Sequence, residues 1–173
     1  MLLFDGVLDS HFISNLEQKL EKTQLKRVDS EIIDKLILKD EKIASVLSSS
    51  EEEQVKGLFE KAINNKSMTL AIESLSPDDL PVTVTMSEWM RRMKDMARTG
   101  GGGGMSFMGN MPDNYNVAIN GNHHIIQKIL KAETEEQKLK LAKQSYDLAL
   151  LSQSMLTGAD LTNFIKRSVE LVS

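Results

Sequence analysis

The stretch "YDLALLSQSMLTGADLTNFIKRSVELVS", residues 146–173, decides how we interpret the fold of this chain. Apolar residues recur through it at the three- and four-residue spacing that is typical of helices with one apolar face. A first helix is predicted to start at a capping box formed by Thr134 and Gln137 and to extend through Met155. A second helix is predicted to start at Asp160. The carboxyl end is therefore expected to be a hairpin of two helices.

The apolar stripes of this hairpin are wider than one partner helix can cover. Leu148, Leu151 and Met155 widen the stripe of the first helix, and a two-helix hairpin is a natural half of a four-helix bundle. We therefore expect a homodimer. Its predicted interface consists of Tyr146, Leu150, Leu151, Met155, Leu161, Phe164, Ile165, Val169 and Val172. Periodicity alone leaves an alternative open, in which the stripes pack on the protein's own sheet.

The preceding part of the chain is predicted to form a small sheet packed with helices. Ser50 and Glu53 have capping-box spacing before a helix with Val55, Leu58, Phe59, Ala62 and Ile63 on its inner face. Three runs with alternating character, at residues 68–74, 81–85 and 115–120, predict a three-stranded sheet. Another helix is expected over residues 122–132. The fold class is α/β in the α+β arrangement, with a helical carboxyl end.

The first part of the chain has a different character. "MLLFDGVLD" is predicted to be a strand, and it is followed by a helix with Phe12, Ile13, Leu16 and Leu20 on one face and by a second strand, "QLKRVD". The abrupt "SSSEEE" has the composition of a linker and predicts two domains, residues 1–48 and 49–173. A fragment of about fifty residues is too small to bury its own core well. We expect it to be the end of a neighbouring domain.

Residues 90–111, "MRRMKDMARTGGGGGMSFMGNM", place six methionines around five consecutive glycines. Thr85 and Ser87 are predicted to cap a helix that carries Met86, Met90 and Met93 on one stripe and ends at the glycines. Methionine is flexible and polarizable, which suits a surface that adapts to many apolar partners. The predicted binding residues are Met86, Trp89, Met90, Met93, Met96, Met105, Phe107 and Met108. The alternative is that the stripe belongs to an ordinary core.

Composition argues against several classes of function. Lys and Arg number 21 against 25 Asp and Glu, and no basic block stands out, so a nucleic-acid partner is not expected. The absence of cysteine excludes thiol chemistry and fits the cytoplasm. No apolar run has membrane-spanning length. The glycines are followed by Met105 and not by the Lys of a phosphate loop.

No catalytic residue or metal site is predicted either. His123 and His124 are adjacent and therefore point to different faces of a helix start, so they are not expected to bind one metal ion together. The Met-x-x-Met spacing would suit Cu(I), but Arg91, Arg92 and Lys94 would repel a cation. The chain is expected to be non-enzymatic and to hold no cofactor.

Several segments, taken in their order along the chain, resemble the ninety-kilodalton heat-shock chaperones in their bacterial form. The resemblance is carried at the carboxyl end by "DLALL", "TGADL" and "NFIKR". Upstream of these, "NVAINGNHHIIQKIL" and "PVTVTMSEWMRRMKDMA" resemble a strand, turn and helix and a Met-bearing helix of that family. Residues 2–36 resemble the end of its middle domain. The likeness extends over essentially the whole chain.

This resemblance implies a carboxyl-terminal dimerisation domain joined to the end of a middle domain, in a parallel homodimer held by a four-helix bundle. It implies that the Met-bearing helix contacts unfolded client proteins, with Met90 and Met93 matching by position. Lys94 stands where related chains have a second large apolar residue. The family's ATPase, with its ATP and magnesium, lies in an amino-terminal domain. The other function that we consider is a monomeric adaptor that binds apolar helices or signal sequences.

Overall fold

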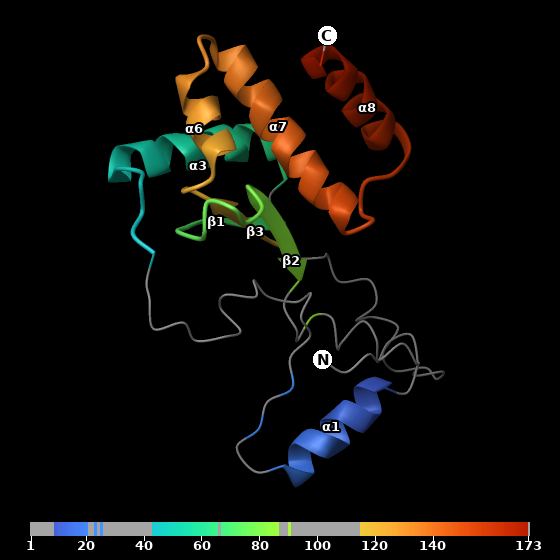
Figure 1. Ribbon diagram of the computed structural model, residues 1–173. Coiled ribbons are helices and arrows are strands. Elements are labelled where there is room, and N and C mark those ends of the chain that lie inside the picture. The colour runs from blue at the N-terminus through green and yellow to red at the C-terminus, as the bar shows by residue number, and fades with distance from the viewer. Residues whose placement is uncertain are drawn as a thin grey trace. The chain divides into compact units, whose positions relative to one another are not determined.

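A computed structural model of the chain describes residues 9–20, 23, 25, 43–65, 67–86, 90 and 115–172 (Figure 1). The chain divides into two units, one formed by 1–38 with 86–114 and the other by 39–85 with 115–173. In the first unit, the described residues include helix α1 (Asp9–Lys19), which confirms the predicted amino-terminal helix. The strands predicted at residues 1–9 and 24–29 lie almost wholly outside the described residues, and the boundary at residue 48 stays a prediction.

The second unit contains a mixed three-stranded sheet and is of the α+β class, as expected. Strands β1 (Met68–Glu73), β2 (Val82–Met86) and β3 (Tyr115–Asn120) lie in the order β1-β3-β2. β1 runs parallel to β3, and their register extends from Met68 opposite Tyr115 to Glu73 opposite Asn120. The strand that comes last in the sequence is therefore central. All three predicted strands are confirmed.

Met86 is the last residue of β2 and is buried. The prediction that it belongs to the following helix is wrong, because the alternation of Val82 and Val84 continues through Met86 and keeps this residue in the strand. Among the neighbouring residues of that predicted helix, the structure describes Met90, which is helical and half-buried.

Helices α3 (Ser49–Ile63), α6 (His124–Lys131) and α7 (Glu135–Ser152) lie on one side of the sheet (Figure 1). Their apolar faces meet the strands in one core. Its buried members are Leu47, Val55, Leu58, Phe59, Val82, Val84, Val117, Ile119, Ile126, Ile129, Ala142, Tyr146 and Ala149. Val55 and Phe59 are fully buried, which confirms the predicted inner face of α3.

Two of these helices start at capping boxes. At α7, the Thr134 hydroxyl accepts from the backbone N–H of Gln137 at 3.2 Å, and the Gln137 side chain accepts from the Thr134 N–H at 3.4 Å, as predicted. At α3, the pair is Ser48 and Glu51 and not the predicted Ser50 and Glu53. The Glu51 carboxylate accepts from the Ser48 N–H at 2.8 Å, and this hydrogen bonding lowers the pKa of Glu51.

Asn120 joins the end of β3 to the loop that follows β1. Its side chain is fully buried. The Oδ1 atom accepts from the backbone N–H of Leu75 at 3.3 Å and from that of Asn122 at 3.1 Å. The Nδ2 atom donates to the Ser76 carbonyl at 2.7 Å. Buried polar groups are tolerated when they are hydrogen-bonded in this way.

Asn122 makes a similar connection to the segment that precedes α3. Its Oδ1 accepts from the Val46 N–H at 2.9 Å, and its Nδ2 donates to the carbonyls of Ala44 at 3.1 Å and Leu75 at 3.0 Å. Asn120 and Asn122 together tie the loop after β1 and the segment before α3 to the end of the sheet from which α6 starts.

Candidate interaction surface on the carboxyl-terminal hairpin

α7 and α8 (Gly158–Val172) form the predicted hairpin. α7 ends in a Schellman motif: the N–H of Met155 donates to the Leu150 carbonyl at 2.9 Å, and the N–H of Ser154 donates to the Leu151 carbonyl at 2.9 Å. Ser154 occupies the left-handed position with φ 56°. Met155 and Leu150 both pack against the core, which fixes the direction in which the chain leaves α7.

α8 is attached to α7 through a polar cluster built around Asp147, whose side chain is only 1% exposed. One carboxylate oxygen pairs with Lys143, one turn earlier on α7, and the other pairs with Arg167 of α8. Arg167 also donates through Nε to Gln144 at 3.3 Å, and Gln144 donates to the Ser168 hydroxyl at 2.6 Å. The cluster therefore fixes which face of α8 turns towards α7.

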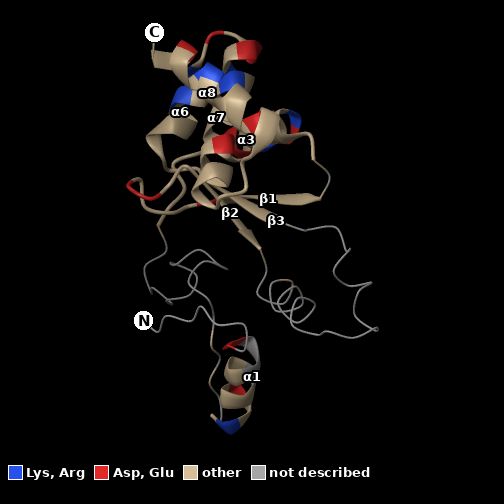
Figure 2. Ribbon diagram, turned by 90° about the vertical axis from the view of Figure 1, so that its right-hand side faces the viewer, with Lys and Arg blue, Asp and Glu red and all other residues tan. Residues whose placement is uncertain are grey.

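Two further contacts lie on the same face of α8. Phe164 is buried, and Glu170 pairs with Lys140 of α7 at the surface. The hydrogen bond from Lys140 and its charge lower the pKa of Glu170. Figure 2 shows the described Lys and Arg residues of this unit on its helices, whereas its acidic residues lie on helices and also in loops. α8 packs mainly against α7, so one side of α8 is covered by its own protomer.

Another side of α8 carries exposed aliphatic residues. Ile165 is 53% exposed, Val169 is 64% exposed and Val172 is 89% exposed. Their spacing of four and three residues places them on one face of the helix. On α7, Leu148 and Leu151 are also exposed. We call these five residues the apolar hairpin face. Exposed apolar residues that share one face of a helix, as the three of α8 do, are typical of interaction sites.

The nine predicted interface residues differ in accessibility. Leu151, Ile165, Val169 and Val172 are exposed, Leu150, Met155 and Leu161 are half-buried, and Tyr146 and Phe164 are buried. The Tyr146 hydroxyl donates to the Met68 sulfur at 3.0 Å inside the core. Burial, with a smaller contribution from Asp147, raises the pKa of Tyr146 to about 12. Tyr146 and Phe164 therefore support the protomer, and an interface would have to use the other seven.

The Met-bearing stretch is described only in part. Met86 lies in β2 and Met90 is helical, as given above. The other predicted binding residues, Trp89, Met93, Met96, Met105, Phe107 and Met108, lie outside the described residues. Their role stays a prediction.

Sequence reasoning did not identify the polar cluster between α7 and α8. The sequence does contain one signal for this cluster, namely Asp147, which is a lone acidic residue in the apolar run "YDLALL". Its partner Arg167 lies on the next helix, and nothing in the periodicity connects the two. In the parts of the chain that the structure describes, no helix is both long enough and apolar enough to cross a bilayer.

No family model matches the chain. It is similar to "Chaperone protein HtpG" of Bacteroides fragilis strain YCH46, with 31% identity over 99% of this chain and 35% of that protein. It is 41% identical to "Chaperone protein HtpG" of Porphyromonas gingivalis strain ATCC 33277 over 87% of this chain and 22% of that protein. The corresponding protein of Bacteroides thetaiotaomicron is 30% identical over 99% of this chain.

The chain spans about a third of the length of the first of these relatives. The alignment with that protein covers 239 positions, whereas this chain has 173 residues. Part of the matched segment of that relative therefore has no counterpart here.

Proposed function

The chain is a relative of the HtpG chaperones, and from this relationship we propose that it holds two chaperone protomers together through α7 and α8. In this proposal it corresponds to the carboxyl-terminal dimerisation domain with the end of the middle domain, and the two hairpins form a four-helix bundle. The observation that carries the proposal is the apolar hairpin face, whose α8 residues remain exposed while α8 packs mainly against α7.

The free energy of dimerisation expected from burial indicates that the whole apolar hairpin face has to contribute. Removing Ile165, Val169 and Val172 of two protomers from water stabilises a dimer by on the order of 10 kcal/mol, at about 1.5 to 3 kcal/mol for each fully buried side chain. Association costs about 4 to 15 kcal/mol in lost freedom of motion. The α8 residues alone would therefore give a weak dimer at best, and Leu148 and Leu151 of α7 are needed to make it stable.

The second part of the proposal concerns clients. We propose that the Met-bearing stretch offers an adaptable apolar surface to unfolded proteins, and what supports this is the chemistry of methionine together with the relationship to chaperones. The ATP-driven steps are assigned to a part of the chaperone outside this segment, which itself would be non-enzymatic and free of cofactors. The cytoplasm is the proposed location.

The dimer is tested by measuring the mass of the chain in solution by light scattering over a wide concentration range. We expect twice the chain mass of 19.3 kDa. Val169→Glu should give monomers, because a charge would be buried in the bundle. Leu80→Glu is the matched control, since Leu80 is an exposed leucine outside the hairpin. A monomeric native chain at all concentrations, or a Val169→Glu dimer of native affinity, would contradict the proposal.

The client surface is tested by replacing Met90 and Met93 with serine. Suppression of aggregation of an unfolded client should weaken while the mass of the dimer stays the same. Unchanged suppression would exclude this surface.

A further inference from the structure

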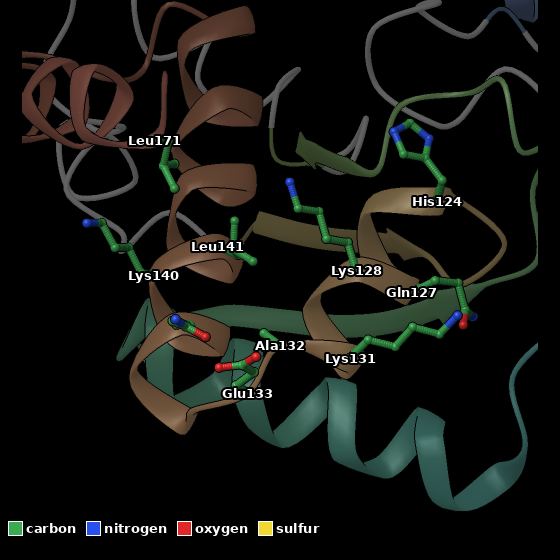
Figure 3. Close-up of a pocket in the computed structure, with 10 residues that line it drawn as sticks. His124, Gln127, Lys128, Lys131, Ala132, Glu133, Lys140, Leu141 and Leu171 are labelled. Atoms are coloured by element: carbon green, nitrogen blue, oxygen red, sulfur yellow. The ribbon is translucent and has the colours of Figure 1, made fainter. Parts of the chain in front are cut away.

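An open pocket of about 930 Å³ lies beside α6 in the second unit (Figure 3). It is bounded by α6, by the connection to α7, by the first half of α7 and by the end of α8. The residues that line it are His124, Gln127, Lys128, Lys131, Ala132, Glu133, Gln137, Lys140, Leu141 and Leu171. A volume of this size is within the range of pockets that bind ligands, about 300 to 1,000 Å³.

α6 supplies a continuous polar face to this pocket. His124, Gln127, Lys128 and Lys131 have the spacing of one helical face, while Ile126 and Ile129 anchor the opposite face in the core. Figure 3 shows these four side chains along α6, with Leu141, Lys140 and Leu171 coming from α7 and α8. The burial of Ile126 and Ile129 therefore fixes the orientation of α6 and keeps its polar face turned towards the pocket.

The pocket has an excess of positive charge. Lys128 and Lys131 are exposed, and within the described part of the chain neither forms an ion pair with a carboxylate. The charge of Lys140 is offset by its ion pair with Glu170, and one acidic residue, Glu133, lines the pocket. Two lysine ammonium groups are therefore available for an anionic ligand.

The remaining lining residues indicate which kind of anion fits. The lining contains no Arg, Ser, Thr or Gly, which are the residues that usually cradle phosphate through guanidinium, hydroxyl and backbone N–H groups. It does contain Gln127, whose amide can both donate and accept hydrogen bonds, as a peptide backbone requires, and Gln137, whose Nε2 can donate while its Oε1 accepts from the Thr134 N–H. Leu141 and Leu171 add an apolar surface.

We infer that this pocket binds an extended acidic peptide segment. Its carboxylates would pair with Lys128 and Lys131, its backbone would bond to the two glutamines, and an apolar side chain would contact Leu141 and Leu171. This site is separate from the proposed dimer function and does not rest on it.

The inference is tested with the full chain and a fluorescein-labelled peptide, Asp-Leu-Glu-Asp-Leu-Glu, by fluorescence anisotropy. We expect saturable binding at about 50 mM salt that weakens at about 300 mM. The double variant Lys128→Gln/Lys131→Gln should bind about tenfold more weakly. The control Lys56→Gln/Lys166→Gln removes two exposed lysines that do not line the pocket, and it should bind as the native chain does.

Further probes separate the alternatives. The amide peptide Asn-Leu-Gln-Asn-Leu-Gln should not bind, and replacing leucine with alanine in the acidic peptide should weaken binding several-fold. Equal losses in the two lysine double variants would show general charge attraction and overturn the proposal. Tripolyphosphate that binds more tightly than the peptide and depends on the same lysines would overturn it in favour of a phosphate ligand. Light scattering on the same samples keeps these outcomes distinct from any change in the dimer.

Discussion

Replacing Asn120 tests how the end of the sheet is held. In Asn120→Ala, the N–H groups of Leu75 and Asn122 each lose a hydrogen bond in a buried site, and the Ser76 carbonyl loses one while it keeps that from the Asp79 N–H. A lost bond is worth about 1 kcal/mol, and a buried group left unsatisfied costs about 1 to 3 kcal/mol. We expect the free energy of unfolding to fall by about 3 to 5 kcal/mol, a large part of the about 5 to 15 kcal/mol of a typical domain.

Asn120→Asp tests the contribution of the Nδ2 donor separately from that of the Oδ1 acceptor. The carboxylate keeps an oxygen for Leu75 and Asn122, but it presents a second acceptor to the Ser76 carbonyl, from which Nδ2 is 2.7 Å away in the native chain. Protonation restores a donor towards Ser76. Burial raises the pKa of the introduced carboxyl above about 3.9, its unfolded value. The stability that the protonated acid contributes is therefore present below the unfolded pKa and lost as pH rises through the folded pKa.

The measurement is urea unfolding of the native chain and both variants at about pH 7 and about pH 4. The deficit of Asn120→Asp relative to the native chain at the same pH should shrink at the lower pH, whereas that of Asn120→Ala should not. Asn116, which is exposed on the same strand, provides the matched control. A cost below about 1 kcal/mol for alanine, or an equal deficit of the aspartate variant at both pH values, would show that Asn120 does not hold this end of the sheet.

Three further changes test other features. Ser154→Gly should raise the free energy of unfolding by about 1 kcal/mol in urea titrations, because Ser154 holds a left-handed φ of 56° that glycine adopts without strain; a loss of stability would contradict this. Burial lowers the pKa of His123 below 6.5, so its contribution to stability is present above pH 6.5 and is lost as pH falls through the folded pKa. His123→Asn keeps the cap acceptor that now bonds to Ile125, and its melting temperature should fall less between pH 7 and pH 5 than that of the native chain. Arg167→Ala leaves the buried Asp147 with Lys143 as its one remaining ion-pair partner among the described residues. The free energy of unfolding should fall by about 3 kcal/mol in urea titrations, which is more than the loss in Lys143→Ala. Small and equal losses in the two variants would show that α8 is held by other contacts.

Local sequence signals predicted the elements of the second unit but not every boundary. Ser48, Ser49 and Ser50 precede three consecutive glutamates, so three registers of the capping box fit α3 equally well. The selection of Ser48 is tertiary, because Leu47 is buried in the core and the Val46 N–H is bound by Asn122. No short-range pattern contains that information.

In the candidate sites too, some features follow from a short sequence pattern and others arise only when the helices pack together. The exposed stripe of α8 was readable from its spacing, whereas the burial of Tyr146 and Phe164 inside the protomer depended on which helix each of them meets. The basic pocket was not predicted, because Lys128, Lys131 and Lys140 form no run in the sequence and are gathered only when α6 packs beside α7.

The central position of β3 has a consequence for how the chain folds. β1 and β2 both pair with a strand that comes after them in the sequence, so each keeps an unpaired edge until β3 lies between them. Strands that are far apart in the sequence pair more slowly than neighbouring segments do. The sheet is therefore expected to be completed late in folding, after the helices, whose hydrogen bonds are local.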